Sequence, residues 1–193
     1  MSELEPFATT WQVAWRGPDG SYEVCALTRV AMGWLLQGSV VASVDGQPMP
    51  VTYSVFCDTR WRTREVRVLA WEARIPAIPP RALTLASDGD GQWRVNGELA
   101  PDLAGCLDVD LGITPATNTL PIRRLALATG ESAPLTAAWV RFPGLNVQPL
   151  GQRYTRLEER GWRYESDTGF TAALSVDAEG LVVSYPGVWE RAG

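Results

Sequence analysis

The chain has 193 residues, of which 46% are hydrophobic and 20% are charged, and its formal net charge is −5. A chain of this length can bury one substantial core, and its modest charge content is not typical of intrinsic disorder. It contains no histidine, and all 17 basic residues are arginine, which excludes histidine-dependent triads and dyads, lysine Schiff bases and histidine-ligated zinc or iron sites.

Short segments rich in β-branched and aromatic residues, separated by turns of Gly, Pro and Asp, predict β-strands through the first half of the chain. We expect these strands over residues 11–15, 22–30, 34–44, 51–57, 61–71, 82–86 and 93–95. The proline-rich stretch over residues 75–80 predicts a break, because proline cannot donate to a sheet. Residues 88–91, Asp-Gly-Asp-Gly, are typical of a hairpin turn, and a short helical turn is expected near residues 101–104.

The second half of the chain repeats this pattern of short strands and turns. We expect strands over residues 107–111, 122–127, 137–142, 153–157, 162–165, 170–176 and 181–185, and no long amphipathic helix. Many short strands with regular turns favour a barrel, roll or sandwich. The sequence therefore predicts an all-β chain with one domain over residues 1–193, a many-stranded antiparallel β-barrel or β-roll with short helical turns at most.

Cysteine usage and the ends of the chain bear on cellular location. Cys25, Cys57 and Cys106 are odd in number and far apart, which favours free, buried and inert thiols. The acidic start over residues 1–6 does not resemble a signal peptide, and the longest apolar run, residues 30–36, is too short to span a bilayer. An acidic chain without a basic block is a poor nucleic-acid binder. We expect a cytoplasmic protein with no transmembrane segment and no nucleic-acid partner.

Residues 106–125 concentrate the polar chemistry of the chain. On a strand, Asp108 and Asp110 share one face. Arg123 and Arg124 are adjacent, so on a strand one points to each face, and an arginine on a core face needs an acidic partner. Asp108 or Asp110 is the natural candidate for that partner.

This polar segment has several possible roles. Residues 117–119, Thr-Asn-Thr, lie between two prolines and are expected to form a loop or an irregular link. The aspartates and arginines suit a structural ion-pair network, a site for a ligand headgroup or, less readily, a pair of carboxylates for acid–base chemistry. A calcium ion held by Asp108, Asp110 and Asn118 is conceivable, although their spacing matches no known calcium loop.

Tryptophan is unusually frequent, with nine residues against five tyrosines and four phenylalanines. Core filling accounts for most of these rings, and the rest suit lining a cavity, stacking on sugar rings or contacting acyl chains. Arg60, Arg62 and Arg64 fall on one face of the strand predicted over residues 61–71. That face is either solvated or grips an anionic headgroup.

Residues 108–125, Asp-Val-Asp-Leu-Gly-Ile-Thr-Pro-Ala-Thr-Asn-Thr-Leu-Pro-Ile-Arg-Arg-Leu, resemble the signature of the putative glycolipid-binding family of bacterial proteins. The resemblance runs from about residue 11 to residue 191. It also includes Tyr53, Asp58, Trp61, Phe170 and residues 90–93, 152–154 and 176–186. It implies a barrel-like β-roll similar to bacterial carriers of lipoproteins and lipids. At Ala116 the chain departs from a bulky phenylalanine common in the family, which either enlarges a nearby cavity or affects packing alone.

These observations favour non-enzymatic binding of a lipid or glycolipid in an apolar β-barrel cavity with a polar rim, without metal, cofactor or catalytic residue. The partner is expected to be a small amphipathic ligand. One alternative is a carboxylate-based carbohydrate-active hydrolase using Asp108 and Asp110. Another is a packed structural or interaction domain with no small ligand. The candidate ligand-binding residues are Asp108, Asp110, Thr114, Thr117, Asn118, Thr119, Arg123, Arg124, Trp61, Trp93 and Tyr154.

Overall fold

The computed structural model describes residues 9–71 and 79–192, and within these residues the chain forms 15 strands, two 3₁₀ turns and one α-helix. The first strands are β1 (Thr10–Arg16), β2 (Tyr22–Val30), β3 (Gly33–Val44), β4 (Gln47–Asp58), β5 (Thr63–Ala70), β6 (Arg81–Ser87), β7 (Trp93–Val95) and β8 (Glu98–Leu99). They are followed by η1 (Pro101–Leu103), β9 (Asp108–Leu111), η2 (Ala116–Asn118), α1 (Thr119–Leu125), β10 (Ser132–Arg141) and β11 (Asn146–Arg156). The chain ends with β12 (Gly161–Ser166), β13 (Thr171–Val176), β14 (Val182–Tyr185) and β15 (Trp189–Arg191).

All of these strands belong to one open sheet. Its order is β8-β7-β6-β5-β4-β3-β2-β1-β15-β14-β13-β12-β11-β10-β9, so the first and last strands of the chain pair in the middle. That pairing places Trp15 opposite Arg191. Neighbouring strands are antiparallel except β9, which runs parallel to β10. The all-β prediction is confirmed, while the sheet remains open where a closed barrel was one of the expected forms.

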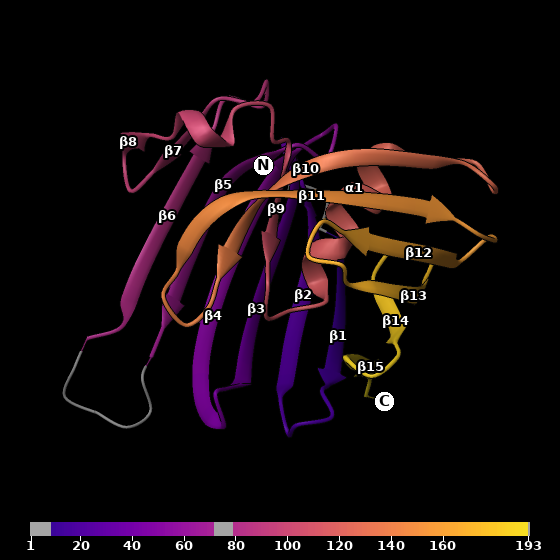
Figure 1. Ribbon diagram of the computed structural model, residues 1–193, viewed down its shortest axis with the longest axis horizontal. Helices are drawn as coiled ribbons and strands as arrows, with labels where there is room; N and C mark the ends of the chain where they lie inside the picture. Colours follow the sequence, from indigo (N-terminus) through magenta and orange to yellow (C-terminus); the bar gives the residue numbers. More distant parts are fainter. Residues whose placement is uncertain (1–8, 72–78, 193) are drawn as a thin grey trace, which may run out of the picture.

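The open sheet folds over on itself into two layers. Strands β1–β6 form one broad layer, and β10–β13 run across its face (Figure 1). The edge strand β9 approaches β5, where the Thr63 amide donates to the Leu107 carbonyl at 2.9 Å. The Val109 amide donates to Thr63 Oγ1 at 3.1 Å. Segment η2–α1 is largely buried, and through Arg124 it bonds to β9.

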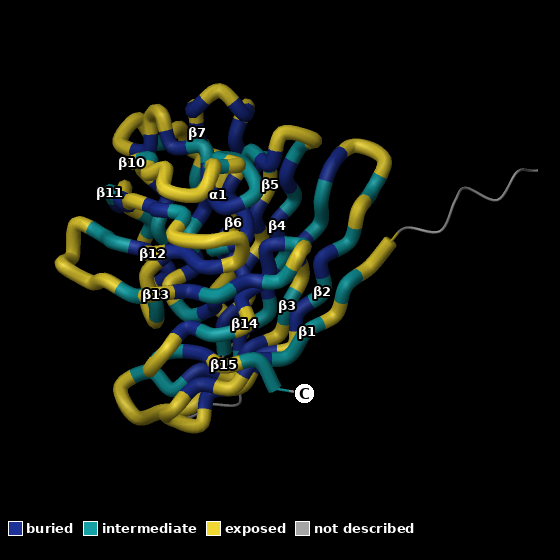
Figure 2. Tube along the Cα trace, turned by 90° about the vertical axis from the view of Figure 1, so that its right-hand side faces the viewer, coloured by how far each residue is buried: buried dark blue, intermediate teal, exposed yellow. Residues whose placement is uncertain are grey.

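Alternation of inward and outward side chains accounts for the core. In β4, residues Val51, Tyr53, Val55 and Cys57 face inward, and the residues between them are partly exposed. Figure 2 shows the same alternation of buried and exposed positions along neighbouring strands. The largest fully buried side chains fill the space between the layers, and they include Trp15, Trp93, Tyr154, Leu27, Leu36, Leu103, Leu111, Leu120 and Leu181. Each such apolar side chain contributes about 1.5–3 kcal/mol of stabilisation.

Two local predictions are wrong. Residues 122–127 were expected to be a strand and 117–119 a loop, but residues 116–125 form η2 and helix α1. Pro121 lies in the first turn of α1, where its missing N–H removes no intrahelical bond. The strand expected from residue 61 begins at Thr63, because Trp61 adopts a left-handed φ of 64° in the preceding turn. The expected helical turn near residues 101–104 is present as η1.

The predictions about the proline break, the acidic start, the cysteines and a membrane span have different outcomes. Residues 75–78 of the proposed proline break and residues 1–6 of the acidic start lie outside the described residues. The three cysteines are free and buried, as expected. In the described ranges, no helix has the length and apolar character needed to cross a bilayer.

The inward glycine of β3 is required by the side chain opposite it. Gly38 pairs with Tyr53, whose ring occupies the space where a Cβ on Gly38 would lie. We expect Gly38→Ala to lower the free energy of unfolding by about 1–3 kcal/mol, because a methyl group there overpacks the core. Urea unfolding measures this, with Ser39→Ala on the exposed face as a control that changes it by less than about 0.5 kcal/mol. A free energy of unfolding of Gly38→Ala equal to that of the wild type would contradict this packing.

Candidate functional site

Asp108 forms a buried ion pair with Arg124. Asp108 is 1% exposed, and Arg124 donates to it from Nη2 at 2.6 Å and from Nε at 2.9 Å. Burial raises the pKa of Asp108, and the hydrogen bonds and charge of Arg124 oppose that shift. The predicted aspartate–arginine pairing is therefore present, with Arg124 as the partner and with the arginine on a helix instead of a strand.

Asp110 lies two residues further along the same face of β9 but has a different environment. Its Oδ2 accepts a hydrogen bond from Gln152 Nε2 at 2.6 Å, and it has no arginine within ion-pair distance among the described residues. Burial raises the pKa of Asp110 to about 6, and the Gln152 hydrogen bond opposes the shift. Asp110 is thus a carboxyl group that changes charge just below neutral pH.

The threonines of residues 114–119 hold the segment in place. Thr114 Oγ1 donates to Glu23 Oε1 at 2.8 Å and accepts from the Ala116 amide at 2.9 Å. Thr117 Oγ1 accepts from the Leu111 amide at 3.3 Å, and Thr119 Oγ1 donates to the Gly180 carbonyl at 3.0 Å. These hydroxyls satisfy backbone and side-chain groups that are buried, so their first role is structural.

Asn118 links the segment over residues 114–119 to strand β11. Its Nδ2 donates to the Pro115 carbonyl at 3.1 Å, and its Oδ1 accepts from the Tyr154 hydroxyl at 2.8 Å. Tyr154 is 2% exposed, so its hydroxyl depends on this acceptor. Ala116, which was expected to affect a nearby cavity or packing alone, is fully buried and belongs to the core.

Asp110, Thr114 and Asn118 line the same hollow of about 350 Å³, whose other residues come from the part of the chain between β9 and β15. Aromatic rings supply much of its wall. These rings are Trp139 of β10, Tyr164 of β12, Phe170 before β13, Tyr185 of β14 and Trp189 of β15. The centroid of Phe170 lies 6.1 Å from those of Tyr164 and Tyr185, and its side chain is partly exposed at the rim. A carboxyl, an amide and several hydroxyls beside aromatic rings suit a ligand with both polar and apolar surface.

The remaining predicted residues lie away from this hollow. Asp108 and Arg124 form an ion pair with each other. Thr117, Thr119 and Tyr154 are buried and do not line the hollow. Trp93 is 1% exposed, and its Nε1 donates to the Cys106 carbonyl at 2.8 Å. Trp61 stacks on Trp34 with a centroid distance of 4.3 Å, and Arg123 lies 5.2 Å from its ring. The chain therefore brings together three of the eleven predicted residues in this hollow.

Arg60 and Arg62 precede β5, so the predicted strand face of Arg60, Arg62 and Arg64 does not form, but Arg62 and Arg64 bind residues 87–90 at the expected hairpin turn. Arg62 Nη1 donates to the Gly89 carbonyl at 2.8 Å and to Asp90 Oδ1 at 2.7 Å. Arg64 Nε donates to the Ser87 carbonyl at 3.1 Å. The Asp88 carboxylate accepts hydrogen bonds from the backbone amides of Asp90 and Gln92, which stabilises the predicted hairpin turn. In the described ranges, no cluster of three carboxylate or thiol side chains is arranged to hold a metal ion.

Glu23 is a buried carboxyl group that the sequence analysis missed. It is fully buried on β2, and its Oε1 accepts hydrogen bonds from the hydroxyls of Tyr53 and Thr114. Its Oε2 has no partner among the described residues. Burial raises the pKa of Glu23 to about 7, and the two hydrogen bonds oppose the shift. The available signal was its position, because Glu23 lies two residues before Cys25 and therefore on the same inward face of the strand expected over residues 22–30.

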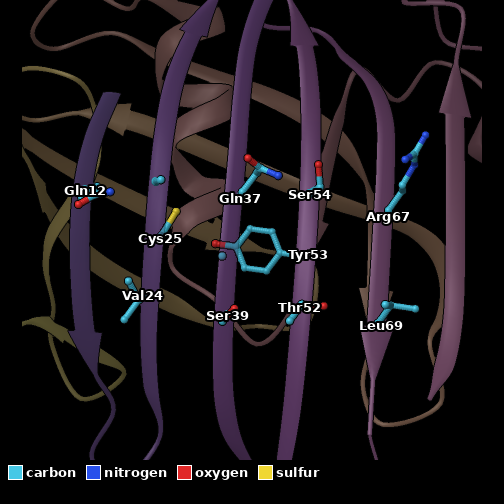
Figure 3. Close-up of a pocket in the computed structure, with 12 residues that line it drawn as sticks. Gln12, Val24, Cys25, Gln37, Ser39, Thr52, Tyr53, Ser54, Arg67 and Leu69 are labelled. Carbon is cyan, nitrogen blue, oxygen red and sulfur yellow. The ribbon is translucent and has the colours of Figure 1, made fainter. Parts of the chain in front are cut away.

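A larger hollow of about 550 Å³ lies on the face of β1–β5 that is turned away from β10–β13 (Figure 3). Short side chains such as Ser39, Thr52 and Ser54 leave this part of the sheet shallow. Its lining contains no carboxylate, and its one aromatic residue, Tyr53, is 4% exposed with its hydroxyl bonded to Glu23. The hollow beside Asp110 therefore offers the richer chemistry.

Comparisons with known proteins agree with the fold. The family model described as putative glycolipid-binding matches residues 12–191. The crystal structure of a DUF1089 family protein from Pseudomonas aeruginosa is similar to this chain, with a TM-score of 0.78 and 34% sequence identity. The alignment covers 99% of this chain and 100% of that one. No curated protein matches the sequence.

The buried ion pair predicts an asymmetry between two adjacent arginines. We expect Arg124→Gln to lower the free energy of unfolding by about 3–5 kcal/mol, because it leaves Asp108 buried without its partner. Arg123→Gln should lower it by less than about 1 kcal/mol, because this side chain forms no ion pair within the described ranges. Urea unfolding of both variants at neutral pH measures the difference. Equal losses of unfolding free energy in the two variants would show that the ion pair between Asp108 and Arg124 does not anchor α1.

Glu23 predicts a decline in stability with rising pH. The unfolded chain releases this proton near pH 4.5, whereas the folded chain keeps it to about pH 7. The folded state therefore binds more protons in this window, and Glu23 makes the free energy of unfolding fall by about 3 kcal/mol across it. We expect Glu23→Gln to lack this decline.

The measurement is the difference in free energy of unfolding between wild type and Glu23→Gln at several pH values from 4 to 8. All other titrating groups are shared and cancel in that difference. Parallel curves for the two proteins would contradict the raised pKa of Glu23.

Proposed function

The chain belongs to the putative glycolipid-binding family, and on this premise we propose that it binds a glycolipid non-covalently, with a headgroup sugar in the hollow beside Asp110. The observation that carries the proposal is the lining of that hollow. Five aromatic residues line it together with one carboxyl side chain, one amide side chain and the hydroxyls of Thr114, Ser166 and Thr168. Sugars present apolar faces to aromatic rings and hydroxyls to carboxylates and amides, so both parts of the lining have a counterpart in such a ligand.

The size of the hollow bears on how much of the ligand enters it. Small-molecule sites typically measure about 300–1,000 Å³, and a hollow of about 350 Å³ is near the lower end of that range. This volume favours a headgroup sugar over a whole lipid. The core between the layers contains fully buried side chains such as Trp15 and Leu27. We therefore place the apolar part of the ligand outside the core, beginning at Phe170 on the rim.

Binding is favoured over catalysis by the charges in the hollow. Glycoside hydrolysis usually requires two carboxyl groups on either side of the scissile bond. Asp110 is the one carboxyl group among the described residues that line this hollow, and Asp108 is held by Arg124. The proposed role is therefore that of a binding protein without catalytic residues.

The proposal predicts saturable binding of octyl glucoside, a soluble glycolipid analogue, measured by isothermal titration calorimetry. We expect Asp110→Asn to weaken binding about tenfold, because a hydrogen bond to a charged group contributes about 1.5–3 kcal/mol. The exposed Asp102→Asn is the matched control and should bind like wild type. Affinity of the wild type should fall as the pH drops through about 6, while Asp110→Asn should not show this change.

Two further results test the same proposal. Native mass spectrometry of the freshly purified protein should show a co-purifying glycolipid. If none is bound, the protein should bind a glycolipid that is added. Octanol at the same concentrations should not give the Asp110-dependent signal, because it lacks the sugar. No binding of octyl glucoside together with no bound lipid would overturn the proposal and favour a packed structural domain.

A further inference from the structure

A third hollow, of about 330 Å³, lies between helix α1, strand β12 and the turn that follows β13. It shares no lining residue with the hollow beside Asp110. Its lining includes Arg123 and Arg156, and we propose that it binds a phosphate-type oxyanion, either inorganic phosphate or a phosphate ester of a headgroup. The inference does not depend on the proposed glycolipid function.

Both arginines in this hollow lack an acidic partner among the described residues. Arg123 donates one hydrogen bond, from Nη1 to the Ala178 carbonyl at 3.2 Å. Arg156 donates to three carbonyls, those of Leu127, Glu158 and Glu159. Carbonyl oxygens are neutral, so they satisfy N–H groups but leave both positive charges uncompensated. Most N–H donors of Arg123 also remain available to a ligand.

Neighbouring groups fix the two guanidinium groups in position. Arg123 lies 5.2 Å from the centroid of the Trp61 ring, and Arg156 lies 5.8 Å from that of Trp162. Gly180 packs against the stem of Arg123, since a Cβ there would lie 3.0 Å from Arg123 Cδ. Held side chains lose little conformational freedom when a ligand binds, which favours affinity.

Trp162 forms part of the wall beside Arg156. It lines the hollow and is 3% exposed, yet its Nε1–H has no hydrogen-bond acceptor among the described residues. A buried donor without an acceptor is unfavourable. Phosphate offers several acceptor oxygens and matches the planar fork of a guanidinium group.

The two carboxylates that line the hollow do not cancel this positive charge. Asp177 is already satisfied, because its Oδ2 accepts from Arg191 at 2.8 Å and its Oδ1 accepts the amides of Glu179 and Leu181. Glu159 is exposed, and water screens its carboxylate. When Arg191, the partner of Asp177, is counted with the four charged lining residues, their formal charges sum to +1, so an oxyanion meets a positive site at Arg123 and Arg156.

The test is isothermal titration calorimetry of the full chain with sodium phosphate, at an ionic strength kept constant with sodium chloride. We expect saturable binding that Arg123→Gln weakens about tenfold, with Arg123→Lys intermediate because it keeps the charge but loses the fork. Arg94→Gln is the matched control, because Arg94 also donates one hydrogen bond to a carbonyl, that of Gly97, and should bind like wild type.

A second readout keeps the proposal testable if Arg123→Gln folds poorly. In the wild type, added phosphate should shift the indole N–H resonance of Trp162 in ¹⁵N-resolved NMR spectra and leave that of the buried Trp93 in place. Glycerol 3-phosphate is the second probe. Tighter binding of this ester than of phosphate assigns the site to a headgroup, and the reverse assigns it to free phosphate. No saturable binding of either probe, or equal binding by Arg123→Gln and wild type, would overturn the proposal.

Discussion

The ion pair between Arg124 and Asp108 ties helix α1 to strand β9, in the space where the two layers of the sheet meet. A charged pair at this depth is tolerated only when both partners are present and well aligned. The same requirement extends along the segment that precedes the helix. Thr114 and Thr119 each donate to an acceptor on a distant part of the chain, namely Glu23 and Gly180. A polar segment can therefore lie within a β-rich core because almost every buried polar group has a partner.

The alternation of buried residues made most of the fold predictable. Strand β4 places apolar side chains at every second position from Met49 to Cys57, and this pattern is visible in the sequence. Helix α1 was not predictable in the same way, because Ile122 and Leu125 in a short apolar segment fit a strand equally well. Its helical form depends on contacts with β9 and with the turn after β13, and these exist only in the folded chain.

The candidate site was predictable in part, for a related reason. Sequence pattern identified Asp110 and Asn118, because polar residues cluster near them in the chain. The aromatic wall comes from five segments between residues 139 and 189, and no local pattern shows that they converge. Tryptophan count alone does not separate the roles either. Trp15 is buried with its Nε1 bonded to the Val182 carbonyl, whereas Trp139 lines the hollow.

Helix α1 and strand β12 also relate the two hollows to each other. Asn118 lines one hollow and Arg123 the other, and five residues of helical rise separate them by about 8 Å along the segment. On β12, Tyr164 and Trp162 line the same two hollows from one inward face, about 7 Å apart. Because the ion pair with Asp108 positions α1, it sets the geometry of both hollows at once. Each hollow nevertheless has its own polar groups, so substitutions at Asp110 and at Arg123 report on them separately.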